Sequence, residues 1–153
     1  MQTAYSRIGL GVIKPRPVLR CIAKCNRQYP NYFFEVIVYN NQDDLHKAFE
    51  WLSFTPDKEH GYKHLLAGCT EIRTECDNGK LVGREDCIGL ILFSKDWLRV
   101  GCISHESTHA AMSFFRRIKK SVTLKNEELF ATVVGNIARQ IANKTKRLWK
   151  DDE

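Results

Sequence analysis

The last third of the chain is predicted to form two long helices joined by a short polar connection. Apolar residues recur at helical spacing from about Arg99 to Lys119 and again from about Lys125 to Leu148. In the second helix, a stripe of large apolar residues runs beside a face of small ones, which lets a neighbouring backbone approach closely. Such helices must cover an apolar surface, and this requirement limits the folds open to the chain.

The preceding part of the chain supplies strands for that surface. Pro15 and Pro17 introduce an extended segment, Val18–Ala23, and a turn-like stretch follows at Asn26–Asn31. Aromatic and β-branched residues predict a strand at Tyr32–Tyr39. A continuous apolar run, Cys87–Phe93, predicts another strand.

A shorter helix is expected to begin at the polar segment Asn40–Asp44 and to end at Pro56. Residues 57–86 are harder to assign: Leu65–Arg73 fits either a strand or a short helix, and Asp77–Lys80 fits a turn. The order of elements predicts one α+β domain over residues 1–153, with a small mixed sheet and the helices packed on one side of it.

A His-Glu-x-x-His motif lies inside the first long helix, at His105-Glu106-Ser107-Thr108-His109. Residues four apart stand one above the other on a helix face, so both imidazoles can reach one metal ion. Glu106 is rotated by about 100° from His105, so its carboxylate can reach a water molecule on the metal without being a ligand. In a helix this motif predicts a zinc site with a catalytic glutamate.

A catalytic zinc ion usually has three protein ligands and one open position. The second long helix offers Glu127 and Glu128 near its start, and eighteen residues lie between His109 and Glu128. That interval allows a turn and a return to the site. The two glutamates border the small-residue face on either side, so helical periodicity does not choose between them.

The motif and the glutamates together resemble the gluzincin metallopeptidases, in which a helix after the His-Glu-x-x-His helix carries a glutamate ligand. Residues 105–111 and 127–135 are also similar to segments of small phage-encoded metallopeptidase-like proteins, His-Glu-x-x-His-Ala-Ala and Glu-Glu-x-x-Ala-x-x-x-Gly. The resemblance covers roughly residues 87–145. It implies a minimal zincin-like fold with Glu128 as third ligand, although Thr132 stands where many gluzincins have a supporting acid.

The resemblance implies a zinc-dependent hydrolase, most simply a metallopeptidase that acts on a peptide or protein. Glu106 would take a proton from the water on the zinc ion and pass it to the leaving amine. Zincins often bind substrate along a sheet edge, and by that resemblance Gly89–Ser94 is expected to be the edge strand. Four residues stay open as donors to the oxyanion: His60, Tyr62, His64 and Arg116.

The chain carries a net charge of +6, with basic residues gathered in segments 14–27, 116–125 and 139–150. The segments favour a solubilising surface, because they hold few aromatic residues and no known nucleic-acid motif. The competing hypothesis is a basic binding protein for nucleic acid or a host protein, with zinc structural or absent. Glu106 separates the two hypotheses, because a structural zinc site does not need it.

No apolar stretch is long enough to span a membrane, and the first residues lack the apolar segment of a signal peptide. We therefore expect a cytoplasmic protein, acting in the cytoplasm of an infected host cell if it is phage-encoded, without a membrane partner. The six cysteines are then expected to be reduced thiols. The oligomeric state is left open by the sequence.

Overall fold

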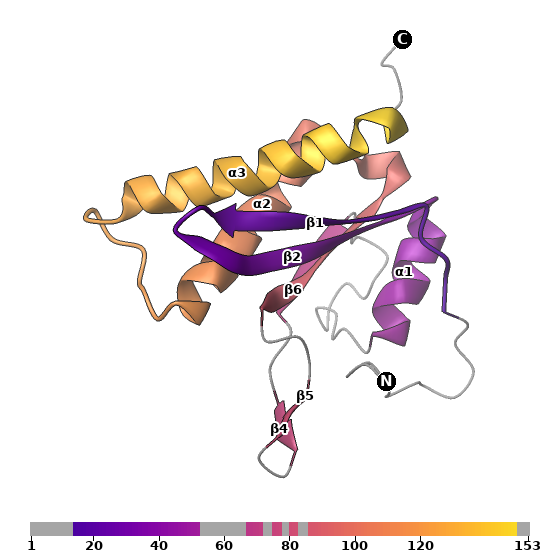
Figure 1. The fold of residues 1–153 in the computed structure, drawn as a ribbon. Helices are drawn as coiled ribbons and strands as arrows, with labels where there is room; N and C mark the ends of the chain where they lie inside the picture. The colour runs from indigo at the N-terminus through magenta and orange to yellow at the C-terminus, as the bar shows by residue number, and fades with distance from the viewer. Residues whose placement is uncertain (1–13, 53–66, 72–74, 78–79, 83–85, 150–153) are drawn as a thin grey trace, which may run out of the picture.

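The computed structural model describes residues 14–52, 67–71, 75–77, 80–82 and 86–149 (Figure 1). Its main sheet has four strands in the order β1-β2-β6-β3. Strand β1 (Leu19–Asn26) pairs antiparallel with β2 (Tyr29–Tyr39), β2 pairs parallel with β6 (Cys87–Ser94), and β6 pairs antiparallel with β3 (Ala67–Glu71). This arrangement confirms the α+β class and the small mixed sheet.

Two short strands outside the main sheet, β4 (Glu75–Asp77) and β5 (Lys80–Val82), pair antiparallel with each other. They flank the segment predicted as a turn. In the main sheet, β1 extends the predicted segment Val18–Ala23 at its C-terminal end, and β2 begins at Tyr29. The turn-like stretch is therefore much shorter than expected, and Asn26 Oδ1 accepts a hydrogen bond from the Gln28 N–H at 2.7 Å within it.

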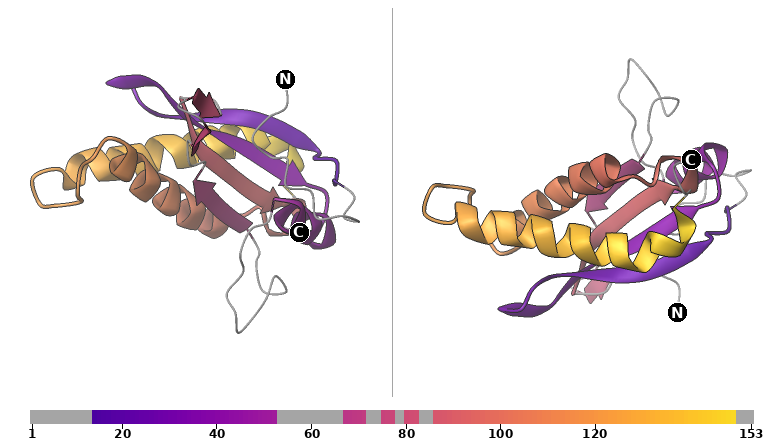
Figure 2. Two further views of the ribbon diagram at one scale, coloured as in Figure 1. Left: turned by 90° about the horizontal axis from the view of Figure 1, so that it is seen from below. Right: turned by 90° about the horizontal axis from the view of Figure 1, so that it is seen from above.

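Helices lie on both faces of the sheet (Figures 1 and 2). Helices α2 (Val100–Arg117) and α3 (Glu127–Thr145) cover one face, and α1 (Gln42–Trp51) covers the other. The expectation that the helices pack on one side is therefore wrong. The physical reason lies in β6, where Ile91 and Phe93 face the core under α2 and α3, while Leu90 and Leu92 face the core under α1.

Strand β6 lies inside the sheet, with β2 on one side and β3 on the other. All eight of its residues are buried. The prediction that Gly89–Ser94 forms an edge strand is therefore wrong. A continuous apolar run is typical of a strand that is covered on both faces, and such strands occupy the middle of a sheet. The edges of the described sheet are β1 and β3.

Helix α1 begins as predicted, because Asn41 caps it by accepting a hydrogen bond from the Asp44 N–H at 2.8 Å. The helix ends at Trp51, and the predicted end at Pro56 lies outside the described residues. Its Phe49 packs directly on β3 at Gly68. A Cβ atom at Gly68 would lie 2.9 Å from two ring carbons of Phe49, so this close approach requires glycine.

Helix α3 lies along β1 and closes that edge of the sheet with side-chain hydrogen bonds (Figure 2). The Lys24 N–H donates to Gln140 Oε1 at 3.0 Å, and Gln140 Nε2 donates to the Lys24 carbonyl at 2.8 Å. One helical turn later, Lys144 Nζ donates to the Ile22 carbonyl at 2.5 Å. These bonds satisfy outward-facing backbone groups that an edge strand would otherwise expose to another chain.

Candidate metal centre

Helix α2 exposes both motif histidines and buries the glutamate between them. The helix follows its predicted range closely, and its packed side includes Ile103, Ala110 and Phe114. Glu106 lies on that side and is 6% exposed, whereas the His105 side chain is 68% exposed. The 3.6-residue period of the helix therefore places the motif residues on different faces: the two imidazoles point outward and the carboxylate points inward.

The two imidazoles are close enough to share one metal ion. Their Nε2 atoms are 3.1 Å apart, and their ring centroids are 4.7 Å apart with an angle of 71° between the planes. Two nitrogens that each bind zinc at about 2.0–2.1 Å in a tetrahedral site stand roughly 3.4 Å apart. The observed separation is thus within a few tenths of an ångström of a shared-ligand arrangement. His105 and His109 therefore fit as two ligands of a zinc ion.

Glu106 stands beside this pair, with Oε1 4.0 Å from His105 Nε2. Burial in the protein raises the pKa of the Glu106 carboxyl to about 7. One turn earlier on α2, the pKa of the half-buried Cys102 thiol is raised first by burial and then by the Glu106 charge. A carboxyl group with a pKa near neutral is suited to accept and release a proton at physiological pH.

The structure does not bring a third ligand to the histidines. Glu127 and Glu128 are both exposed in the first turn of α3, and the described residues hold no group of three metal-ligating side chains. His109 lies eight residues before Arg117, the end of α2, which is about 12 Å of helix. Glu128 is the second residue of α3, so α3 would have to begin opposite the middle of α2 to deliver it.

The connection between the helices is held by its own hydrogen bonds. Asn126 stands at the N-cap position of α3, but its side chain makes no capping bond to the helix. Its Oδ1 instead accepts from the Thr123 N–H at 2.8 Å, and its Nδ2 donates to the Ser121 carbonyl at 2.7 Å. The Asn126 amide therefore stabilises the turn before the helix instead of capping the helix.

Sheet strands β3 and β6 lie against α2. Strand β3 comes from the segment Leu65–Arg73, for which the sequence left a strand and a short helix open. Its Ala67 is buried in the core beneath α2, and Cys69 packs against the same core. The signal for β3 was weak because the strand has only five residues. It is nevertheless the edge strand on the α2 side of the sheet.

The candidates for an oxyanion donor are only partly covered by the structure. Arg116 donates from Nη2 to Ser113 Oγ at 3.0 Å, one turn earlier on α2. The other three, His60, Tyr62 and His64, lie outside the described residues. The structure therefore gives no preference among the four.

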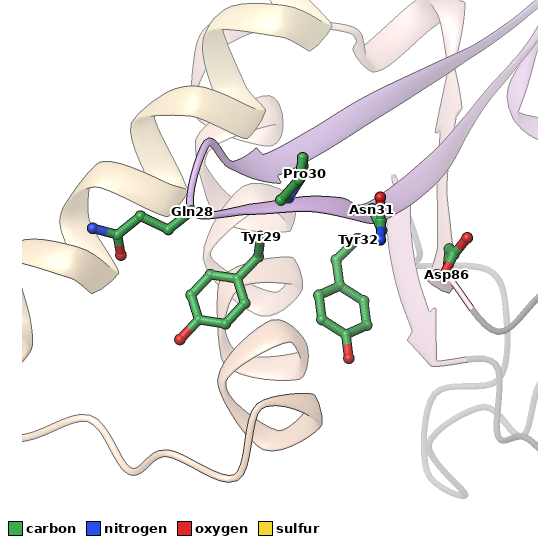
Figure 3. A pocket seen from close by; sticks show the side chains of 6 residues that line it. All are labelled: Gln28, Tyr29, Pro30, Asn31, Tyr32 and Asp86. Atoms are coloured by element: carbon green, nitrogen blue, oxygen red, sulfur yellow. The ribbon is translucent and has the colours of Figure 1, made fainter.

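A cavity of about 280 Å³ lies at the start of β2, away from the motif (Figure 3). Tyr29 and Tyr32 line it, and both rings contact Phe114 of α2, with centroid distances of 5.3 and 6.2 Å. Gln28, Pro30, Asn31 and Asp86 complete the lining, and none of these residues belongs to the motif. The histidines are thus on the exposed surface of α2 rather than in this cavity.

No protein-family model, curated protein or solved structure shows a significant match to the chain. Among the helices of the described residues, none has the length and apolar character needed to cross a bilayer.

Proposed function

We propose that the chain is a zinc-dependent hydrolase, and most simply a metallopeptidase, with His105 and His109 as zinc ligands. The observation that carries the proposal is the pair of Nε2 atoms, 3.1 Å apart on an exposed helix face, beside a buried carboxylate. Two ordinary surface histidines have no need of a buried acid at the position between them. Burying a carboxylate costs stability unless it is paired, and such costly groups are concentrated at functional sites.

Glu106 is the proposed general base and acid. A zinc ion, when bound, supplies a Lewis acid that polarises a carbonyl and makes a water molecule more acidic. Glu106 takes the proton from the attacking water and gives it to the leaving amine. In the metal-free protein, burial raises its pKa to about 7, which makes the carboxylate a stronger base than an ordinary glutamate.

Glu128 is the proposed third ligand, on the family resemblance, with Glu127 as the alternative. Both side chains are exposed at the start of α3, so neither is committed to a buried contact of its own. A change in the α2–α3 connection would be needed to bring the first turn of α3 toward His109. Comparing the zinc affinity of Glu128→Ala with that of Glu127→Ala distinguishes the two ligands.

The proposed binding site for the substrate backbone lies along β3, an edge strand of the described sheet. The opposite edge of the sheet is closed, because Gln140 and Lys144 of α3 occupy the backbone groups of β1. Strand β3 lies against α2, the helix that carries the histidines. An extended peptide or protein segment that adds to β3 would gain main-chain hydrogen bonds near the site. We place this activity in the cytoplasm, including that of an infected host cell.

The decisive variant is Glu106→Gln, assayed against a fluorescent casein substrate with zinc content measured in parallel. We expect it to keep wild-type zinc and to lose at least about 100-fold in rate, since general acid–base catalysis contributes about 10²–10⁴-fold. Glu50→Gln, an exposed acid on α1, is the matched control and should keep full activity. Wild-type activity in Glu106→Gln, or unchanged zinc content in His105→Ala, would contradict the proposal.

A further inference from the structure

Positive charge is concentrated on two segments of the chain that the fold places together. Residues 14–34 hold five basic residues and no acidic one, and residues 129–149 hold four basic residues and no acidic one. The remaining 15 basic residues are outnumbered by 18 acidic ones, so the rest of the chain is net negative. The acidic residues 151–153 follow the second segment in the sequence and lie outside the described residues.

These two segments contain β1 and α3, which run antiparallel along each other (Figure 2). The hydrogen bonds fix their register, since Gln140 meets Lys24 and Lys144 meets Ile22. Two residues of strand rise about 6.6 Å and four residues of helix rise about 6.0 Å, so the register continues in both directions. The exposed cations along this border form what we call the basic edge: Arg20, Lys24, Arg27, Arg139, Lys144 and Arg147.

The basic edge differs from a surface that only keeps a protein in solution. Such surfaces intersperse both signs of charge. Among the described residues, one acid forms an ion pair with the basic edge: Glu35 of β2, whose Oε1 lies 3.4 Å from Arg20 Nε. Side-chain amides of α3, including Asn136 and Asn143, stand among the cations and add neutral hydrogen-bond donors.

We propose that the basic edge binds the phosphate backbone of a double-stranded nucleic acid. From Arg139 to Arg147 the cations extend over about 12 Å of helix, a length over which each strand of a duplex presents several phosphates. Arginine suits this role because its planar guanidinium pairs with phosphate in a bidentate manner. The inference stands independently of the hydrolase proposal, because no residue of the basic edge belongs to the zinc site.

The chemistry of the surface favours a duplex over other polyanions. Single-stranded nucleic acid is usually held by exposed aromatic rings, and the basic edge has none. A membrane surface calls for protruding apolar side chains, yet Val18 and Ile22, beside the basic edge, are only 40% and 39% exposed. Leu124, which is 88% exposed and the most exposed large aliphatic side chain of the described residues, lies in the α2–α3 connection, beyond the opposite end of α3.

The test is fluorescence anisotropy of a labelled 20-base-pair DNA duplex, titrated with the full chain at several NaCl concentrations. We expect binding whose affinity falls steeply with salt. The double variant Arg139→Gln/Arg147→Gln should weaken binding at least tenfold at 100 mM NaCl and reduce the log–log salt slope by about 2. Lys119→Gln/Lys120→Gln removes the same charge from the α2–α3 connection and should change affinity less than twofold.

Each other outcome overturns the inference. These are no duplex binding at 50 mM NaCl, equal losses in the two double variants, or preference for a single-stranded 20-mer. Tighter association with vesicles containing phosphatidylserine than with the duplex would do the same. Circular dichroism of both variants confirms that they are folded before the comparison. The variant His105→Ala/His109→Ala should bind the duplex like the wild type. This result would show that duplex binding does not depend on the proposed zinc site.

Discussion

Neighbouring residues of one motif have opposite environments on α2. His105 and His109 face solvent, where an imidazole needs no compensation, whereas Glu106 is 6% exposed. Desolvation disfavours the charged form of a carboxyl group, which is why its pKa rises to about 7. The residue that we propose for catalysis therefore also reduces the stability of the metal-free fold at neutral pH.

Glu106→Gln should stabilise metal-free protein at pH 8 but much less at pH 4. The carboxyl has a pKa of about 7 in the folded state against an ordinary 4.5, so the folded state binds its proton more tightly. The contribution of Glu106 to the free energy of unfolding is therefore most favourable below pH 4.5. It falls as the pH rises toward 7, by on the order of 3 kcal/mol. Glutamine does not ionise, so the variant escapes this loss.

The measurement is urea unfolding at both pH values in the presence of a chelator. Exposed Glu50→Gln serves as control and should leave the pH dependence as it is in the wild type. A stability difference between Glu106→Gln and the wild type that is the same at pH 4 and pH 8 would argue against a raised pKa.

At the scale of the element, the residue that follows the end of α2, Lys119, has a backbone conformation that its side chain disfavours. Lys119 has φ of 56°, a left-handed conformation that disfavours side chains with a Cβ atom. The Lys119 N–H donates to the Arg116 carbonyl at 3.1 Å, and the Lys120 N–H donates to the Phe115 carbonyl at 2.9 Å. This is a Schellman motif, in which glycine is the preferred residue at the left-handed position.

Lys119→Gly is therefore expected to stabilise the protein, by about 1 kcal/mol. The gain from relieving the left-handed conformation exceeds the extra freedom that glycine has in the unfolded chain. Lys120→Gly is the matched control, because Lys120 has no left-handed backbone and should lose stability or stay unchanged. Denaturant midpoints of the two variants give the comparison, and equal effects would contradict the assignment of strain to Lys119.

At the scale of the whole molecule, ligand binding should be visible as stability. A zinc ion that binds only the folded state stabilises it by mass action, by about 2.7 kcal/mol at a hundredfold excess over Kd. For a chain of this size, that corresponds to a rise in Tm of roughly 5–10 °C. We expect this shift on adding zinc to the chelator-treated wild type, measured by differential scanning fluorimetry.

The double variant His105→Ala/His109→Ala should show no such shift, and excess chelator should reverse it in the wild type. An equal rise in the double variant would mean that zinc binds elsewhere, for example at the cysteines. Both histidine side chains are exposed, so the double variant should keep the fold, and circular dichroism checks this.

The elements that could be predicted are those whose signal is local. Both long helices lie within the predicted ranges, because their period of apolar residues extends over many turns. Strand β6 is correctly predicted as a strand, but the prediction that it lies at the edge of the sheet is wrong. The composition of one strand does not determine which strands pair with it. Strand β3 was left ambiguous, because five residues carry too few repeats of a period-2 pattern.

By itself, the sequence determined the two long helices and the i, i+4 spacing that brings the imidazoles of His105 and His109 together. Both depend only on contacts within a few residues. The tertiary structure alone decided that α1 covers the opposite face from α2 and α3, and that β1 and β3 are the edges of the described sheet. It also placed the cations of β1 beside those of α3. These features depend on which distant segments pair, and pairing is set by the burial of the whole apolar surface at once.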